Sequence, residues 1–257
     1  MLKKYKSKFY KYPIEVESIT WEILVKIFTK NQKEVIYSWY DLEEKTSYSP
    51  YIKNAVLASF IWKIPEDILI LGFWAWSYAK YFKDYLWEKV NISWVEIDES
   101  MIEIAKNEFK LNNINYFNLD IKEALNILSK KKTNKFEVIF IDIYDENSLV
   151  PKFFLENKFI QSITSLLNTN WKIIFNYANY NENKNFYEKI DKLFLENLKN
   201  KEKIHILNWK DDYWNLIAVY NLKEKFDSEK IILEYLQKVQ AWDINYDSNL
   251  ISKIHLK

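Results

Sequence analysis

The sequence predicts an α/β protein with a doubly wound, mostly parallel sheet of seven strands and a small antiparallel β-sheet at its N-terminus. From residue 67 onwards, apolar runs alternate with segments of helical periodicity, as in a parallel sheet with crossover helices. The runs 68–71 and 138–141 are apolar throughout, which is typical of central strands covered by helices on both faces. Residues 12–39 instead alternate apolar and polar positions, which predicts strands with one exposed face.

The N-terminal region contains three short alternating segments. Their apolar positions are Ile14, Val16 and Ile19 in the first, Ile23, Val25 and Ile27 in the second, and Val35 and Tyr37 in the third. The polar turn 30–33 separates the last two segments, so we expect an antiparallel sheet. Residues 51–61 then carry apolar side chains at helical spacing. We place a small β domain at residues 1–50 and the main domain at 51–257.

The main domain alternates strands and helices without a repeat or a low-complexity linker. Strands are expected at 67–72, 91–97, 114–118, 136–142, 171–177, 203–209 and 214–220. Helices are expected at 77–86, 99–112, 121–130, 152–168, 184–199 and 227–240. The short turn 210–212 joins the last two strands, which indicates an antiparallel edge. In such a sheet, ligands bind outside the carboxyl ends of the strands.

Composition excludes several classes of function. With 49% hydrophobic residues and a net charge of +1, the chain can bury a core and has no global field that would attract nucleic acid or membrane. It lacks cysteine and has two histidines, so we expect no disulfide and no metal site. No apolar run approaches a membrane span and the first residues do not resemble a signal peptide, so we expect a soluble cytoplasmic protein.

The chain has eleven tryptophans and one glycine. Average usage would give roughly 18 glycines at this length. Several tryptophans, among them Trp74, Trp76, Trp94 and Trp171, stand at strand edges or turns where glycine is useful. Our hypothesis is that UGA codons read as glycine in the source were translated as tryptophan, and the lack of arginine fits AT-rich coding. The alternative is a tryptophan-rich protein, or a lineage that reads UGA as tryptophan. A gene with mostly UGG at these positions contradicts the hypothesis.

Two motifs follow the first two strands of the main domain. Gly72-x-Trp74-x-Trp76 becomes a Gly-x-Gly-x-Gly turn under the glycine hypothesis, and such a turn lets a nucleotide-like ligand approach the backbone. Glu96, in the string Val-Glu-Ile-Asp, ends the next strand 24 residues after Gly72. A carboxylate there can accept hydrogen bonds from both ribose hydroxyls of an adenosine. Taken alone, Glu96 is equally compatible with a strand-end charge and Asp98 with a helix cap.

Two further acidic motifs follow the third and fourth strands. Asp120 is placed to accept a hydrogen bond from an adenine amino group, although its type alone favours the cap of the following helix. Asp142 and Asp145, with Glu146 behind them, can raise one another's pKa and attract a cation, or can form a solvated loop. The joint occurrence of the four motifs predicts a site for an S-adenosyl cofactor with an acidic region beside it.

On these residues, the sequence from about Val35 to Tyr177 resembles the spermidine synthase family of aminopropyltransferases and its methyltransferase-fold relatives. The resemblance implies a Rossmann-like cofactor-binding catalytic domain at 51–257. It assigns the cofactor turn to Gly72, Trp74 and Trp76, the ribose-binding acid to Glu96, the adenine contact to Asp120, the acidic pair to Asp142 and Asp145, and a substrate-side tyrosine to Tyr48. The chain departs from the family at Pro50, where polyamine synthases carry glutamate, and over residues 146–151, which replace an Asp-Pro-x-Gly-Pro segment.

The activity implied by the resemblance is transfer of an aminopropyl group from decarboxylated S-adenosylmethionine to a diamine such as putrescine. We assign Asp142 as the base and Asp145 as the anchor for the distal ammonium, with Tyr48 or Tyr51 orienting the amine. Asp142 would also repel the carboxylate of S-adenosylmethionine itself.

Other functions stay open. A methyltransferase using S-adenosylmethionine is the first alternative, a non-catalytic adenosine-binding relative the second. NAD binding is weaker, because Asp120 and the acidic pair have no role in it. The expected partner is a small-molecule amine, with no nucleic acid or membrane, and a homodimer is compatible with the sequence.

Overall fold

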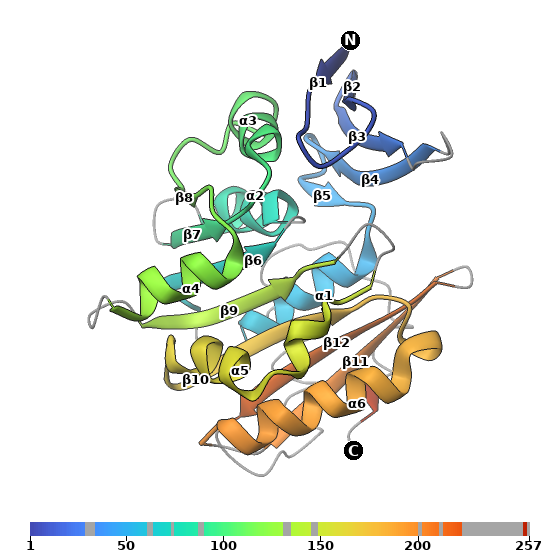
Figure 1. The fold of residues 1–257 in the computed structure, drawn as a ribbon. Helices are drawn as coiled ribbons and strands as arrows, with labels where there is room; N and C mark the ends of the chain where they lie inside the picture. Colours follow the sequence, from blue (N-terminus) through green and yellow to red (C-terminus); the bar gives the residue numbers. More distant parts are fainter. Residues whose placement is uncertain are drawn as a thin grey trace.

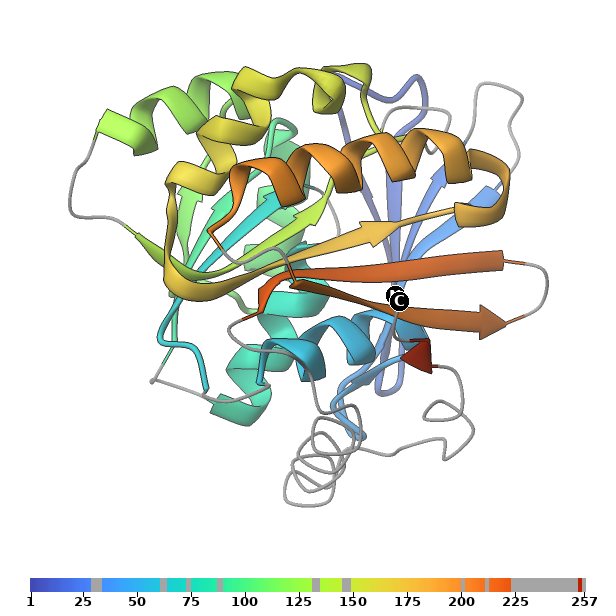
Figure 2. The same cartoon turned by 90° about the horizontal axis from the view of Figure 1, so that it is seen from below.

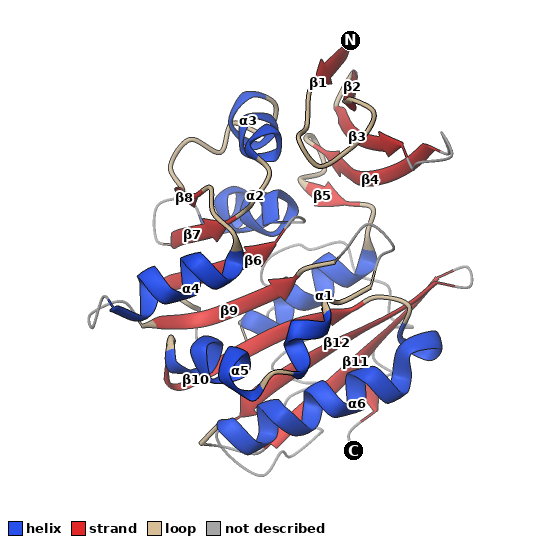
Figure 3. Ribbon diagram, in the orientation of Figure 1, coloured by secondary structure: helices blue, strands red, loops and turns tan. Residues whose placement is uncertain are grey.

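The computed structural model describes residues 1–28, 34–60, 64–72, 75–86, 90–130, 135–144, 149–199, 202–210, 213–222 and 254–255. It contains a small sheet and a large sheet with helices on both faces of the large one (Figures 1 and 3). The predicted fold class, α/β with a small antiparallel sheet at the N-terminus, is confirmed.

The small sheet has five strands, all antiparallel, in the order of the sequence. They are β1 (Leu2–Tyr5), β2 (Ile14–Ile19), β3 (Glu22–Phe28), β4 (Glu34–Asp41) and β5 (Thr46–Ser47). The alternation seen in the sequence puts Ile14, Val16 and Val25 in the core.

The large sheet contains the seven expected strands. They are β6 (Asp67–Gly72), β7 (Asn91–Val95), β8 (Asn115–Phe117), β9 (Phe136–Asp142), β10 (Leu167–Tyr177), β11 (Glu202–Lys210) and β12 (Tyr213–Leu222), and the two-residue β13 (Ile254–His255) adds an eighth at the edge. The order is β13-β11-β12-β10-β9-β6-β7-β8. From β8 to β10 every pair is parallel, while β12 runs antiparallel between β10 and β11. The chain leaves β6 towards β7 and returns at β9, so the topological switch point lies between β6 and β9.

The helices are α1 (Pro50–Ser59), α2 (Ala75–Leu86), α3 (Glu99–Asn107), α4 (Ile121–Lys130), α5 (Asn157–Ser165) and α6 (Tyr180–Asn197). The single helix expected at 152–168 is divided into a 3₁₀ turn, η2 (Lys152–Leu155), and α5, because Glu156 between them has an extended backbone. Strand β10 begins early instead: Leu167 pairs with Phe136 of β9, and the register shifts before Lys172. The helix expected at 227–240 lies outside the described residues. Within the described segments, no helix is both long and apolar enough to span a bilayer.

The two faces of the large sheet carry separate cores. Helices α1, α2 and α3 cover one face together with the small sheet, and α4, α5 and α6 cover the other (Figure 2). The small sheet is also tied to α2 by polar contacts: Ser38 Oγ lies 3.0 Å from Ser77 Oγ, and the Tyr40 hydroxyl donates to Asp84 at 2.8 Å. Residues 1–47 therefore share a core with the main domain, and the boundary at residue 50 stays a prediction that coincides with the start of α1.

Candidate active site

Gly72 closes β6 at the switch point, directly opposite Asp142 of β9. Its φ of +103° lies in a region that other residues rarely adopt. A Cβ at this position would lie 2.3 Å from the backbone oxygen of Asp142 and 2.6 Å from Cγ1 of Ile143. The chain thus keeps its one glycine where both the backbone conformation and the close approach of β9 require one.

Asp142 is a fully buried carboxylate at the carboxyl end of β9. The Tyr78 hydroxyl donates to Oδ2 at 3.1 Å and the side-chain amide of Asn176 donates to Oδ1 at 3.0 Å. Both partners are neutral. Burial raises the pKa of Asp142 to about 7, although the two hydrogen bonds act in the opposite direction. The carboxyl group therefore keeps its proton to a much higher pH than an exposed aspartate does.

Buried phenols surround this carboxylate. The Tyr144 hydroxyl donates to the backbone oxygen of Asn176 and accepts from the Ala178 amide at 3.1 Å. Burial, followed by the nearby charge of Asp142, raises the pKa of Tyr78 and of Tyr144 well above the ordinary range. Tyr51 is also buried and adds to the raised pKa of both. The phenols of Tyr78 and Tyr144 therefore keep their protons and act as hydrogen-bond donors.

Tyr78 and Asn176 are site residues that sequence reasoning did not single out. Asn176 stands next to the end of β10, in the run Phe-Asn-Tyr, so the strand-end argument that selected Asp142 applies to it equally. Tyr78 had no such signal, because it projects from the first turns of α2 and only the packing of α2 on the sheet brings it to Asp142.

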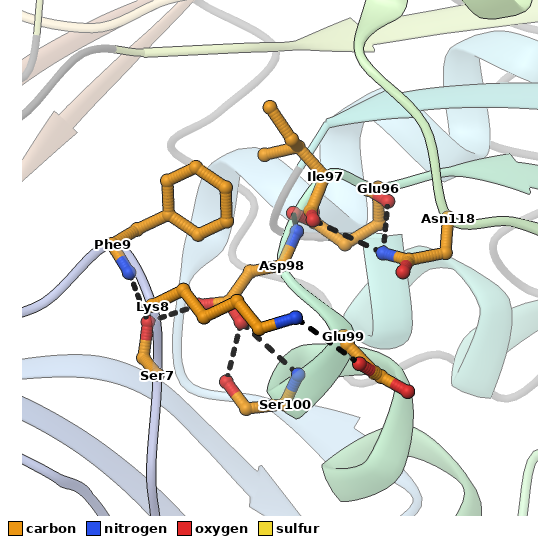
Figure 4. Close-up of polar contacts among 9 residues, drawn as sticks. All are labelled: Ser7, Lys8, Phe9, Glu96, Ile97, Asp98, Glu99, Ser100 and Asn118. Atoms are coloured by element: carbon orange, nitrogen blue, oxygen red, sulfur yellow. Dashed lines mark hydrogen bonds and ion pairs between the residues drawn. The ribbon is translucent and has the colours of Figure 1, made fainter.

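Glu96 follows β7 and is 3% exposed (Figure 4). Its Oε1 accepts the backbone N–H of Asp98 at 2.8 Å, whereas the buried Oε2 has no hydrogen-bond partner among the described residues. Burial raises the pKa of Glu96 to about 8. The side-chain amide of Asn118 holds the adjoining backbone by donating to the carbonyl oxygens of Glu96 and Ile97, each at 3.0 Å. A buried carboxyl oxygen without a hydrogen-bond partner is a feature that a ligand hydroxyl would satisfy.

The structure shows that Asp98 and Asp120 both cap helices. Asp98 accepts the backbone N–H of Ser100 at 3.0 Å at the start of α3, and Asp120 accepts that of Lys122 at 2.8 Å at the start of α4. Asp120 is exposed, so its second oxygen is accessible. Its contact with adenine stays a prediction.

Tyr48 lies on the small sheet, away from the hydrogen bonds around Asp142. Its hydroxyl donates to Glu22 at 3.1 Å and its ring stacks on Trp39 with centroids 4.0 Å apart. Of the two tyrosines considered for orienting an amine, Tyr51 is the one that acts electrostatically on Tyr78 and Tyr144, and the role of Tyr48 stays a prediction. Trp74 and Asp145 lie outside the described residues. Among the residues that are described, no group of three or more His, Asp or Glu side chains is arranged to hold a metal ion.

Two of the tryptophans at suspected glycine positions, Trp76 and Trp94, are buried. The Trp76 ring stacks on Phe109 with centroids 5.5 Å apart, inside the core between α2 and α3. The Trp94 indole donates to the backbone oxygen of Gly72 at 2.7 Å. Among the described residues, the non-glycine residues of positive φ are Thr20, Lys45, Lys110 and Asn179, so the described tryptophans have negative φ values. The gene's codons, rather than backbone strain, are the test of the glycine hypothesis.

Comparisons with known proteins agree with this architecture. A probable spermidine synthase from Corynebacterium glutamicum superposes with a TM-score of 0.70 at 17% identity, covering 91% of this chain and 86% of that one. Spermidine synthase from Thermotoga maritima superposes with a TM-score of 0.62 at 11% identity, covering 100% of this chain and 91% of that one. Human methyltransferase-like protein 13, in complex with SAH, superposes with a TM-score of 0.58 at 21% identity, covering 77% of this chain and 95% of that one. At these identities the likeness shows the fold alone.

A comparison with curated protein sequences finds no significant match. The family model described as the spermine/spermidine synthase domain matches residues 78–216, more than half of the chain, and this span includes Glu96, Asp142 and Asn176. The chain therefore belongs to the spermine/spermidine synthase family.

Proposed function

We propose that this protein transfers an aminopropyl group from decarboxylated S-adenosylmethionine to a small diamine such as putrescine. The observation that carries the proposal is the state of Asp142. It is a fully buried carboxylate at the sheet's switch point, both of its hydrogen-bond partners are neutral, and its pKa is about 7.

A primary amine has a pKa of about 10 and is protonated at neutral pH, so it must lose a proton before it can act as a nucleophile. Asp142 can accept that proton, because a base is most effective when its pKa is near the working pH. In its ionised form Asp142 also favours a cation beside it, since no positive side chain contributes to its pKa among the described residues. Tyr78 and Asn176 fix the carboxylate in one orientation.

The residues present fit an adenosyl group. Glu96 has one buried oxygen without a partner among the described residues, which a ribose hydroxyl would satisfy. When bound, the sulfonium compound supplies an electrophilic carbon with a good leaving group. The chain's own contribution is then to position the amine and to remove its proton. As parts of the same proposal, Asp120 contacts the adenine amino group, Asp145 holds the distal ammonium and Tyr48 lies on the substrate side.

A methyltransferase acting from S-adenosylmethionine is the second candidate. Pro50 begins α1 at the position where the resemblance places a glutamate of polyamine synthases, so this carboxylate for an amine is missing. A non-catalytic adenosine-binding protein is the third, and it gains support if Trp74 and Trp76 are genuine, because indoles at the cofactor turn reduce the space for a ligand.

The deciding experiment measures affinity for both sulfonium compounds by calorimetry and identifies products by mass after incubation with a panel of amines. It uses the chain as printed and a variant with Trp74→Gly and Trp76→Gly. Preference for the decarboxylated compound and a product enlarged by an aminopropyl group are expected. Tighter binding of S-adenosylmethionine, with methylated products, would replace this proposal by the methyltransferase. Binding without any product would support the non-catalytic alternative.

A further inference from the structure

The N-terminal segment contacts both ends of α3, the helix that follows Glu96. At the C-terminal end, Lys3 Nζ lies 2.8 Å from Oε1 of Glu108, and the Tyr5 hydroxyl donates to the same carboxylate. At the N-terminal end, the Ser7 hydroxyl donates to Oδ2 of the capping residue Asp98. Residues far apart in the sequence are thus joined beside the strand end that carries Glu96 (Figure 4).

The direction of the Ser7 hydroxyl follows from its hydrogen bonds. A serine hydroxyl has one proton to donate and two lone pairs that accept. The backbone N–H groups of Phe9 and Tyr10 donate to Ser7 Oγ at 2.9 and 3.1 Å, so both lone pairs are engaged. The remaining proton is directed at Asp98. Ser7 and Asp98 are 8% and 3% exposed, so water competes little for these bonds.

The hydrogen bond from Ser7 helps to fix Asp98, and Asp98 in turn is hydrogen-bonded to Glu96. Oδ1 of Asp98 accepts the backbone N–H and the hydroxyl of Ser100, at 3.0 and 2.7 Å. With both carboxylate oxygens engaged, the backbone of Asp98 is fixed, and its N–H donates to Oε1 of Glu96 at 2.8 Å. That bond selects which oxygen of Glu96 is occupied and leaves Oε2 buried without a partner among the described residues.

We propose that Ser7 is a positioning residue of the nucleoside site: through Asp98 it holds Glu96 so that Oε2 faces the ribose hydroxyls. The inference rests on the proposed function of Glu96 and adds the N-terminal segment to the site. Because the connection runs through one hydroxyl, removing that hydroxyl should weaken nucleoside binding in a protein that is otherwise folded.

The test compares Ser7→Ala and Ser7→Thr with the matched control Lys8→Ala. Lys8 adjoins Ser7 and reaches the same end of α3, but its contact with Glu99 is 3.8 Å long between exposed side chains. By calorimetry with methylthioadenosine, Ser7→Ala should weaken binding about five- to tenfold. Ser7→Thr, which keeps the hydroxyl, and Lys8→Ala should stay within about twofold of the parent. Equal affinities for Ser7→Ala and the parent, or equal losses in Ser7→Ala and Ser7→Thr, would overturn the proposal.

A second readout needs no ligand. The backbone N–H of Asp98 should exchange with solvent about tenfold faster in Ser7→Ala than in the parent, and at an unchanged rate in Lys8→Ala, because Ser7 donates a hydrogen bond to the Asp98 side chain and Lys8 does not. An unchanged exchange rate in Ser7→Ala would overturn the positioning role even if affinity falls. Should neither the parent nor the variant with Trp74→Gly and Trp76→Gly bind methylthioadenosine, the proposed function fails, and the exchange rate still decides whether Ser7 fixes Asp98.

Discussion

Asp142 and Asp191 are two buried aspartates on opposite faces of the large sheet, and they are held in opposite ways. Neighbouring residues of β10 reach them: the Asn176 side chain donates to Asp142, and the Tyr177 hydroxyl donates to Asp191 at 3.3 Å. Successive side chains of a strand point to opposite faces, so one strand serves both carboxylates. Asp142 is 0% exposed and Asp191 is 4% exposed, so burial does not distinguish them.

The charge of the partners distinguishes them. Asp191, on α6, is paired with Lys203 and lies 3.2 Å from Nε2 of His205, and the Tyr220 hydroxyl also donates to it. Burial alone would raise its pKa, but these partners hold the pKa below the ordinary value. Asp142 has neutral partners and a pKa of about 7. A buried acid whose cation is supplied by the protein serves stability, whereas one without a cation is suited to receive a proton or a cationic ligand.

The largest expected effect is on turnover. If Asp142 is the base, Asp142→Asn should lower the turnover number by about 10²–10⁴-fold, because an amide keeps the shape but cannot take the proton. Binding of methylthioadenosine should be nearly unchanged. Asp191→Asn is the matched control and should keep the turnover of each folded molecule. Similar losses in both variants would mean that the comparison of the two acids does not identify the base.

The second effect concerns stability as a function of pH. The folded pKa of Asp142, about 7, exceeds its unfolded value of 3.8, so the folded state loses stability as pH rises between these values. We expect Asp142→Asn to be more stable than the parent by on the order of a few kcal/mol at pH 8, and similar to it at pH 4. Urea denaturation at the two pH values measures this. A variant less stable than the parent at pH 8 would show that Asp142 is stabilised by a cation.

Asp191 should behave with the opposite sign. Its folded pKa lies below 3.8, so its contribution is present above pH 3.8 and is lost as pH falls through the folded pKa. Asp191→Ala should destabilise the protein at pH 7 by about 3 kcal/mol, since it leaves the positive partner partly buried without its carboxylate. Lys192→Ala, which removes an exposed pair 3.9 Å long with Glu196, should cost about 0–1 kcal/mol. If urea denaturation shows that Asp191→Ala and Lys192→Ala lose the same free energy of unfolding, the structural role of Asp191 is contradicted.

The smallest expected effect tests a third buried acid, Glu96, which resembles Asp142 in its raised pKa but is proposed to bind hydroxyls. Glu96→Ala should weaken methylthioadenosine binding at least tenfold, or about 1.4 kcal/mol, because a hydrogen bond to a carboxylate contributes about 1.5–3 kcal/mol. Calorimetry on folded protein gives the ratio, and a loss below threefold would place the ribose elsewhere.

The sequence alone predicted much of the main sheet. The limits of β6 and β9 agree with the expected ranges, because fully apolar runs bounded by polar residues leave little choice of register. The strand-end rule also selected Gly72, Glu96 and Asp142, which the structure places at the carboxyl edge. The prediction of one helix at 152–168 was wrong, because a helical apolar period reveals neither an extended residue such as Glu156 nor the pairing of Leu167 with Phe136 at the start of β10.

What the sequence determined by itself is local: apolar periodicity, polar strand ends and the need for glycine at position 72. The tertiary structure decided which partners each buried aspartate has. Asp142 and Asp191 have the same chemical character in the sequence, and only packing gave one neutral partners and the other Lys203 and His205. Ser7 reaches Asp98 across 91 positions of the chain for the same reason. The pKa and the role of a buried group depend on its neighbours in space, and periodicity along the chain does not specify them.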